Sequence, residues 1–504
     1  MLETPWQNVS DAIFHHAREH PRAPAVVDSR AALDYAEFAD LVGRVSLYLH
    51  GLGIAPGERV ALSLGNSVEH MVLAFATIRM GAILVDIPWL SGQAERDRVL
   101  AINRVDTIFI EPDAQPAPVA RSIWVDAGWR SLAAAKPGDY RHEGSIDDDC
   151  NIGLSTGTTG AFKGIVKTHR HLLLRCHVLA DLYAGTEILS VERPANFLLV
   201  GTTAGGVYFQ RAVAQLCVGG SIVLVPGYLR TPDLMRTIAA WGDAVCFLVP
   251  AFCKNLLEAA RQSGPMFPRI RALFAGGQPL PFADKVAMLE RLTPNFYEHY
   301  GNGGCGPTTL LRPSEMLRKR ESVGRASKLL EVEVVDAEGR PLPPGTVGRL
   351  RCKGPAVSTR FFDPSDGAGG GEAFADGGYY PGDIAMMDAE GYIYFKGREA
   401  TAIRQAGGTV PAGDIEAVLA AHSLVREAVV VGRPAANGGE EAVAFVVLRG
   451  KLEHDELARH CSERLPPQKL PRQVYYLTEM PHTEGGKIDL SRLKTIAASG
   501  AGRG

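Results

Sequence analysis

Short apolar runs alternate with longer stretches of helical periodicity through the first half of the chain. β-rich runs at 23–28 and 59–64 predict strands, and apolar residues recurring at helical spacing predict helices over 36–53 and 67–82. Further apolar runs continue the alternation at 196–201, 221–227, 244–252 and 271–277. Repeated strand–helix–strand units of this kind predict an α/β fold, with parallel sheets and helices packed on their faces.

The pattern changes near residue 330. Two strands joined by a Pro/Gly turn follow, which predicts an antiparallel β-subdomain, and the glycine-dense segment 363–383 predicts a mobile loop. From about 397 the order helix, strand, strand, helix predicts a small α+β domain, with a disordered tail at 497–504. We therefore expect an N-terminal domain over 1–396 and a mobile C-terminal domain over 397–504.

Composition excludes several classes of function. The 504 residues carry 53 Lys+Arg against 56 Asp+Glu, with no basic stripe of the kind that nucleic-acid-binding proteins present. The longest apolar runs are too short to cross a bilayer, and the N-terminus has no signal-peptide pattern. The eight cysteines are scattered singly, which favours buried free thiols over a metal site. The expectation is a cytoplasmic protein that binds neither nucleic acid nor membrane.

The loop LSTGTTGAFKG at 154–164 is the first candidate for chemistry. Small residues let backbone N–H groups approach phosphate oxygens, while threonine hydroxyls and a lysine add donors and charge. The spacing differs from that of the P-loop, because no Gly-Lys pair follows Gly157 at the required distance. The loop therefore predicts a phosphate-binding site of another type.

This loop resembles the signature of the ANL superfamily, which contains acyl-CoA synthetases, peptide-synthetase adenylation domains and luciferases. That signature reads approximately Ser/Thr-Ser-Gly-Ser/Thr-Thr-Gly-x-Pro-Lys-Gly. Five more segments resemble superfamily motifs in the same order: FAGGQPL (274–280), HYGNGGCG (299–306), YYPGDIAMMDAEGYIYFKGRE (379–399), IRQAGGTVPAGDIE (403–416) and TEGGKID (483–489). The resemblance covers essentially the whole chain.

The resemblance implies an enzyme that makes an acyl-adenylate from a carboxylic acid and ATP, then passes the acyl group to a thiol after its C-terminal domain rotates. By position it implies that Lys487 bridges the acyl carboxylate and α-phosphate, and that Ala400 occupies the hinge. The remaining implied positions are phosphate binding by Thr158, Thr159 and Lys163, nucleotide binding by Gly276, Gly277, Tyr300, Asp383 and Arg398, and a CoA tunnel at Gly407 and Gly408.

Several positions depart from the superfamily pattern, among them Ala400, since the hinge residue is usually Asp or Lys. The Thr and Glu of the Tyr-Gly-x-Thr-Glu motif are replaced by Gly303 and Gly304, which removes the usual carboxylate ligand of Mg²⁺. Phe162 and Pro381 also replace a usual proline and threonine. Loss of a metal ligand weakens transition-state stabilisation, so we expect impaired adenylation. Two alternatives stay open: a thioester-forming enzyme supplied with acyl-AMP by a separate adenylating enzyme, or a complete ligase whose Mg²⁺ is held by water and phosphates.

For the thiol acceptor and the carboxylic acid substrate, the sequence predicts a chemical class and no individual compound. No carrier segment follows residue 490, so CoA is expected, with a carrier protein loaded in trans as the alternative. No acidic residue lies near Gly206 to hold an ammonium group, which favours a non-amino acid. A bulky acid is expected because the proposed acyl pocket consists of small residues: Gly205, Gly206, Gly301, Asn302, Gly303 and Gly304. A nucleotide-binding pseudoenzyme is the alternative of a different class.

Overall fold

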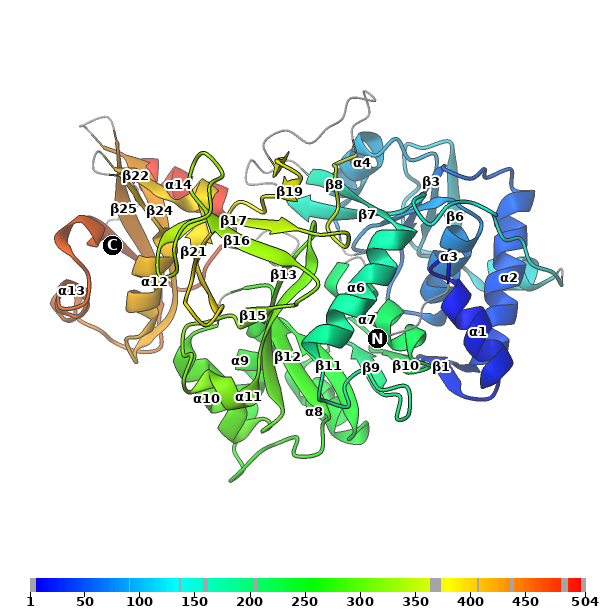
Figure 1. The fold of residues 1–504 in the computed structure, drawn as a ribbon, viewed down its shortest axis with the longest axis horizontal. Helices are drawn as coiled ribbons and strands as arrows, with labels where there is room; N and C mark the ends of the chain where they lie inside the picture. Colours follow the sequence, from blue (N-terminus) through cyan, green and yellow to red (C-terminus); the bar gives the residue numbers. More distant parts are fainter. Residues whose placement is uncertain are drawn as a thin grey trace.

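The computed structural model describes residues 6–89, 91–135, 137–156, 162–203, 206–227, 229–278, 280–362, 373–405, 408–435, 439–481 and 488–499. Two large mixed sheets and a smaller β-subdomain form most of the molecule (Figure 1). The elements after residue 400 lie at the opposite end of the molecule from α1, α2 and α3 (Figure 1). The predicted α/β class is confirmed.

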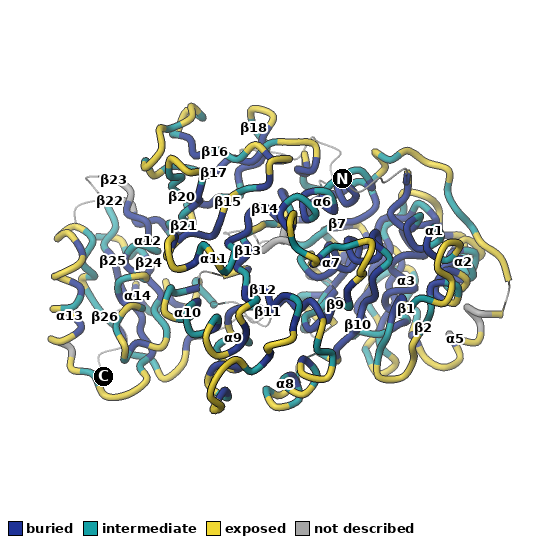
Figure 2. Tube along the Cα trace, turned by 60° about the horizontal axis from the view of Figure 1, so that its bottom comes forward, coloured by how far each residue is buried: buried dark blue, intermediate teal, exposed yellow. Residues whose placement is uncertain are grey.

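The largest sheet has nine strands, and its six central strands are parallel. In spatial order the strands are β15 (Arg325–Ala326), β14 (Gly306–Leu311), β13 (Phe296–Asn302), β12 (Ala272–Gly276), β11 (Ala244–Leu248), β9 (Asn196–Leu199), β10 (Ser221–Leu224), β1 (Pro24–Val27) and β2 (Ala32–Asp34). The central strands are buried on both faces, as expected for a parallel sheet covered by helices (Figure 2).

The second sheet has six strands, in the order β6 (Arg121–Trp124), β5 (Thr107–Ile110), β3 (Arg59–Ser63), β4 (Ile83–Asp86), β7 (Asp149–Thr156) and β8 (Phe162–Thr168). β7 and β8 form an antiparallel hairpin in which Ser155 lies opposite Lys163. The predicted phosphate loop is thus the connection of a hairpin at the edge of this sheet.

Helices cover the faces of the two large sheets. They are α1 (Asp11–Glu19), α2 (Tyr35–Gly51), α3 (Val68–Arg79), α4 (Gln93–Ile102), α5 (Ala127–Ala134), α6 (His169–Leu182), α7 (Gly206–Cys217), α8 (Thr231–Ala240), α9 (Pro250–Ala259), α10 (Phe282–Arg291) and the short α11 (Pro313–Met316). Side chains alternate along the strands, so Phe247 and Phe274 join the core that contains α6 and α7. Their neighbours Cys246 and Leu273 face the core formed with α8, α9 and α10.

The predicted β-subdomain is an antiparallel sheet. Its strands are β16 (Glu331–Val335), β17 (Val347–Lys353), β18 (Phe374–Ala375), β19 (Gly378–Tyr379), β20 (Asp383–Met387) and β21 (Ile393–Arg398). β18 and β19 lie within the segment expected to be a loop, so that expectation is wrong for 373–383, where Phe374 pairs with Tyr379. Residues 363–372 lie outside the described residues.

The C-terminal elements have hydrophobic cores of their own, formed by residues from Ile403 onward. They are the turn η2 (Glu399–Thr401), β22 (Ile403–Gln405), β23 (Gly408–Val410), α12 (Ala412–Ala420), β24 (Val425–Pro434), β25 (Glu440–Leu448), α13 (His454–Ser462), η3 (Pro467–Lys469), β26 (Gln473–Leu477) and α14 (Leu490–Ser499). The boundary at 396/397 stays a prediction.

Two further expectations need correction. The tail begins in α14, where Ala497 is buried, because this helix packs on β24. The run 244–252 is two elements, since β11 ends at Leu248 and Pro250 starts α9, where its fixed φ suits the first helical turn.

Other expectations are met. The eight cysteines are all free and buried, as predicted. None of the described helices is long and apolar enough to cross a membrane.

Candidate active site

The predicted adenine-binding glycines lie at the carboxyl end of β12, where open parallel sheets bind ligands. A Cβ atom on Gly276 would collide with the carbonyl oxygen of His299 on the neighbouring β13. Gly277 has a φ of +90°, and no atom lies within 4 Å of its Cβ position. Gly276 is therefore needed for the approach of two strands, whereas Gly277 borders open space.

Tyr300, Asp383 and Arg398 meet beside these glycines. The Tyr300 hydroxyl donates a hydrogen bond to Asp383 Oδ2, and Arg398 Nε lies 2.8 Å from Asp383 Oδ1. The Asp383 side chain is fully buried while that of Arg398 is 48% exposed. Register explains the pairing, because Asp383 on β20 lies directly opposite Arg398 on β21. The structure thus brings together three residues separated by up to 98 positions in the chain.

The Asp383 carboxylate still has capacity to accept hydrogen bonds. Burial raises its pKa, while the Arg398 charge and the Tyr300 hydrogen bond act in the opposite direction. Despite the ion pair, Oδ1 receives no hydrogen bond of good geometry from the described residues. A buried carboxylate oxygen without a donor fits the hydroxyls of a ribose, which would supply O–H donors.

The turn at 301–304 differs in shape from the open pocket that its small residues predicted. A Cβ on Gly303 would lie 2.6 Å from Ile165 Cδ1, and a Cβ on Gly304 would collide with the Tyr379 ring. Gly301 has equally little room, because its Cβ would collide with the Gly306 carbonyl. Neighbouring side chains and backbone therefore fill the volume that these glycines were expected to open.

Arg175 of α6 contacts the backbone of this turn. Its guanidinium donates hydrogen bonds to the carbonyl oxygens of Gly303 and Gly304, and to Ala356 O and Ser358 Oγ at 3.0 Å each. The Arg175 side chain is buried, and burial lowers its pKa to about 10. These bonds fix the backbone at the two positions where the superfamily pattern has Thr and Glu.

The described part of the acyl region begins at Gly206, the first residue of α7. A Cβ there would lie 3.7 Å from the Nζ of Lys167, which donates a hydrogen bond of 2.8 Å to Asn151 Oδ1. Burial and the nearby Arg175 lower the pKa of Lys167 to about 7. A buried amine that changes charge near neutral pH therefore lies behind the start of α7.

Several predicted residues lie outside the described part of the chain: Thr158, Thr159, Gly205, Gly407 and Lys487. Only the backbone is described for three others: Lys163 is on β8, Gly408 is on β23, and Ala400 lies in η2, directly after Arg398. The roles of these residues stay predictions. Asn302 is described, and its Oδ1 accepts a hydrogen bond of 2.8 Å from the backbone of Cys305, which shapes the turn.

The donor set at 301–304 does not fit a magnesium ion bound directly by protein carboxylates. No group of three or more His, Cys, Asp or Glu side chains suited to a metal occurs among the described residues. Glu298, the nearest acid on β13, is buried and forms an ion pair of 2.5 Å with Lys285, so it is directed away from the turn. How Mg²⁺ is held therefore stays a prediction.

Comparison with protein families assigns the chain. Residues 13–362 match the model of the AMP-binding enzyme family, and residues 414–487 match that of the AMP-binding enzyme C-terminal domain. The chain belongs to the AMP-binding enzyme family.

Relatives of this AMP-binding enzyme are similar over nearly their full length. A feruloyl-CoA synthase from Amycolatopsis sp is 27% identical over 94% of this chain and 95% of its own. The fatty acid–acyl-carrier-protein ligase ScoC of Streptomyces coeruleorubidus is 28% identical over 96% of this chain and 95% of its own. The solved anthranilate CoA ligase AuaEII in complex with anthranoyl-AMP has a TM-score of 0.88 at 22% identity and covers 99% of both chains, which shows a shared fold.

Sequence reasoning missed three buried cations of this AMP-binding enzyme: Lys167, Arg175 and Arg211. Arg175 and Arg211 are lone charged residues within apolar stretches, such as the LLLRC run that contains Arg175, but Lys167 has Arg170 close by. Charged residues are rarely fully buried, so this pattern was a usable signal. It could not show which groups the cations would meet.

Proposed function

We propose that this AMP-binding enzyme joins a non-amino carboxylic acid to a thiol through an acyl-adenylate. The acid's carboxylate attacks the α-phosphorus of ATP and pyrophosphate departs; the thiol then loses its proton, attacks the acyl carbon, and AMP leaves. Asp383 carries the proposal, because a buried carboxylate with an unsatisfied oxygen beside the open Gly277 suits the ribose of a bound nucleotide.

We assign the remaining roles by motif. Lys163, Thr158 and Thr159 hold phosphates, and Lys487 bridges the acyl carboxylate and the α-phosphate, where a compact cation stabilises developing charge. Gly407 and Gly408 line the thiol tunnel, and Ala400 is the hinge. The position of Ala400 supports its assignment, since η2 joins the last strand of the β-subdomain to the C-terminal elements.

We propose CoA as the acceptor. Support comes from the relatives, since the feruloyl-CoA synthase and a long-chain-fatty-acid–CoA ligase of Mycobacterium tuberculosis, 28% identical, are named for CoA. The likeness to the carrier-protein ligase ScoC keeps a carrier protein as the second acceptor to test.

We further propose that adenylation is the weak half-reaction. A glutamate at position 304 is absent, and the Tyr379 ring occupies the place where its Cβ would lie. Mg²⁺ must then be held by water and phosphates if ATP is used, because the turn offers no carboxylate. A separate enzyme that supplies acyl-AMP would bypass this step.

Two parallel assays test the proposal. One contains a panel of acids with ATP, Mg²⁺ and CoA, and the other contains the corresponding preformed acyl-adenylates with CoA. We expect acyl-CoA in both, with a much lower rate in the first. Equal rates would refute weakened adenylation. Stabilisation by acyl-adenylates without thioester from CoA or a carrier protein would refute the ligase and favour a nucleotide-binding pseudoenzyme.

A further inference from the structure

Arg211 is a buried cation that forms no ion pair with the described residues. It lies midway along α7 and is 5% exposed. Its Nη1 donates a hydrogen bond of 3.2 Å to the Val207 carbonyl of its own helix, and its Nε has no hydrogen-bond partner. No carboxylate of the described residues lies within ion-pair distance of it. A buried charge without a paired anion is unfavourable, so its retention requires an explanation.

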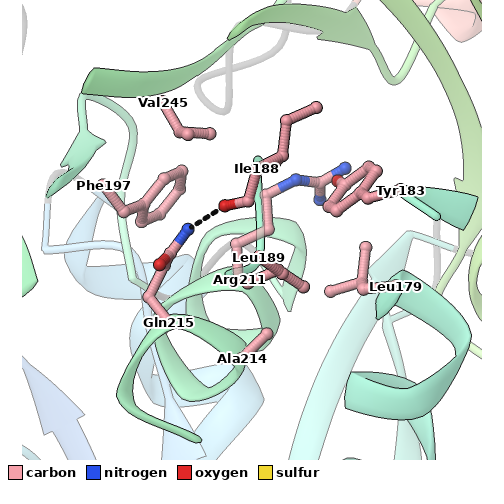
Figure 3. A pocket seen from close by; sticks show the side chains of 9 residues that line it. All are labelled: Leu179, Tyr183, Ile188, Leu189, Phe197, Arg211, Ala214, Gln215 and Val245. Carbon is pink, nitrogen blue, oxygen red and sulfur yellow. Dashed lines mark hydrogen bonds between the residues drawn. The ribbon is translucent and has the colours of Figure 1, made fainter. Parts of the chain in front are cut away.

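Aromatic rings surround the guanidinium and leave its Nε without a hydrogen-bond partner. Its Cζ lies 4.4 Å from the centre of the Phe247 ring and 5.7 Å from that of Phe274. It also adjoins Tyr183 (Figure 3). His299 also faces it, and burial together with the Arg211 charge lowers the pKa of His299 well below its usual range. Cation–π contacts compensate part of the desolvation cost, yet a ring face accepts no directional hydrogen bond from Nε.

Arg211 is close to the proposed active site. The Phe247 ring that it stacks on lies 3.2 Å from the Cβ position of Gly276, at the carboxyl end of β12. Arg211 also follows Gly206, the start of the acyl region, by five residues, which is about 7.5 Å along the helix axis. An acid bound with its reacting carboxylate near Gly206 would therefore extend along α7 toward Arg211.

An apolar cavity large enough for about one water molecule lies beside Arg211. Its wall is mostly apolar and includes Leu179, Phe197 and Val245, with Gln215 one helical turn after Arg211 (Figure 3). Gln215 Nε2 donates a hydrogen bond of 3.2 Å to Ile188 O, and its Oε1 has no partner. Two buried polar atoms without a partner, Arg211 Nε and Gln215 Oε1, thus lie one turn apart on α7.

We propose that Arg211 binds a second carboxylate at the far end of the substrate, so that the preferred acid is a dicarboxylic acid. This inference rests on the proposed function and adds the substrate class. A carboxylate would accept charge-assisted hydrogen bonds from the guanidinium, including the unpartnered Nε, and would neutralise the buried charge. Selection would then depend on charge and not on size, because neighbouring residues fill the volume at Gly303 and Gly304.

The test compares each diacid with its own monomethyl ester, which has nearly the same size but lacks the second charge. Adipate and terephthalate are supplied with their monomethyl esters, both as free acids with ATP and as preformed monoadenylates with CoA. The wild-type enzyme is expected to favour the diacids about 10- to 100-fold in kcat/KM, the range of a lost charged hydrogen bond. Arg211→Met should remove this preference and retain activity on the esters, and Arg211→Lys should keep part of it.

The matched control is Arg193→Met, which removes an exposed arginine that pairs with Glu187 and Asp243 at the surface. It should leave the diacid-to-ester ratio unchanged. A wild-type preference for the esters, or an unchanged ratio in Arg211→Met, would overturn the proposal and leave Arg211 a packing residue.

A binding measurement separates this inference from the proposed function. Adipate should raise the Tm of the wild-type enzyme and not that of Arg211→Met, whether or not a thioester forms. If no thioester forms from any substrate but this difference is seen, the proposed function fails and the carboxylate site stands. If adipate has no effect on the wild-type Tm and the esters turn over as fast as the diacids, the site fails alone.

Discussion

The carboxylate of Asp383 is fully buried between a phenol and a guanidinium, and each neighbour acts on it differently. Tyr300 donates a hydrogen bond to one oxygen, whereas Arg398 supplies charge to the other without a well-aligned hydrogen bond. The first contact orients the side chain and the second favours its ionised form. One oxygen stays able to accept donors from a ligand, which is the property that a ribose site requires.

Asp383→Asn tests this residue directly. The substitution keeps the shape but removes the charge and replaces one acceptor with a donor, so we expect AMP and acyl-adenylate affinity to fall about 10- to 100-fold. Isothermal titration with AMP measures it. Asp388→Asn is the control, because Asp388 follows the same strand but pairs with Lys319. Equal AMP affinities of wild type and Asp383→Asn would show that the ribose lies elsewhere.

Gly304 offers a second test at the same scale. Gly304→Glu would restore the superfamily carboxylate, but its Cβ would collide with the Tyr379 ring, and such overpacking costs about 1–3 kcal/mol. We expect the single variant to lose thermal stability without gaining ATP-dependent activity.

The double variant Gly304→Glu, Tyr379→Ala should gain ATP-dependent activity, because the smaller side chain makes room for the carboxylate. Pyrophosphate release measures the gain, and Tyr379→Ala alone is the control. If the Gly304→Glu single variant is as stable and more active than wild type, the crowding at Tyr379 does not limit the site.

At the scale of elements, the end of β13 is fixed by contacts on both sides of the strand. On one side α10 supplies Lys285, whose Nζ lies 2.5 Å from Glu298 and donates a hydrogen bond of 2.9 Å to Ser322 O. On the other side α6 supplies Arg175, which holds the turn that follows Tyr300. The strand that carries Tyr300, which we propose to contact the nucleotide, is thereby fixed in position by two helices.

Lys285→Met tests the first of these contacts. It leaves the Glu298 carboxylate buried and unpaired, which costs about 3–5 kcal/mol of unfolding free energy. The double variant Lys285→Met, Glu298→Leu should recover most of this loss, since no charge is left buried. Urea denaturation of the variants measures both values, and a single variant as stable as wild type would mean that the pair contributes no net stability.

At the scale of the whole molecule, the two large sheets meet in one hydrophobic core that also encloses charged groups. Lys167 of the second sheet is buried beside Gly206, the first residue of a helix on the first sheet. Because burial lowers the pKa of Lys167 from 10.5 to about 7, the unfolded chain binds a proton more readily than the folded one between these values. The cost of burying this charge is therefore fully present below pH 7 and is relieved as the pH rises toward 10.5.

Lys167→Met should accordingly raise the unfolding free energy more at pH 6.5 than at pH 9, by about 2–3 kcal/mol. Denaturation at the two pH values measures the difference. Lys353→Met, at a more exposed position of the β-subdomain, is the control. A gain that is equal at both pH values would show that the charge of Lys167 is not the source of the cost.

The C-terminal elements give a last prediction at this scale. They have separate cores, so a chain that ends at Glu399 keeps Tyr300, Asp383 and Arg398 and should still bind AMP. It lacks Lys487 and the proposed thiol tunnel and should form no thioester, even from preformed acyl-adenylate. Full thioester formation by the truncated chain would exclude any role of the C-terminal domain.

The sequence alone determined the α/β class, most of the strands and helices, and the order of the superfamily motifs. These features depend on local periodicity and on residue types at fixed spacing, which a linear chain records directly. The sequence could not predict that Asp383 pairs with Arg398, because this pairing depends on the register of β20 against β21.

Three features were decided only by the tertiary structure. The glycines at 303 and 304 predicted open space, but whether removed side-chain volume stays empty depends on neighbours from other elements, here Ile165 and Tyr379. The tail at 497–499 gained its helix by packing on β24, which its own small residues did not indicate. The burial of Arg211 without a paired carboxylate among the described residues was the third feature. The sequence could not predict it, because charge pairing in a core depends on contacts in space and not on sequence spacing.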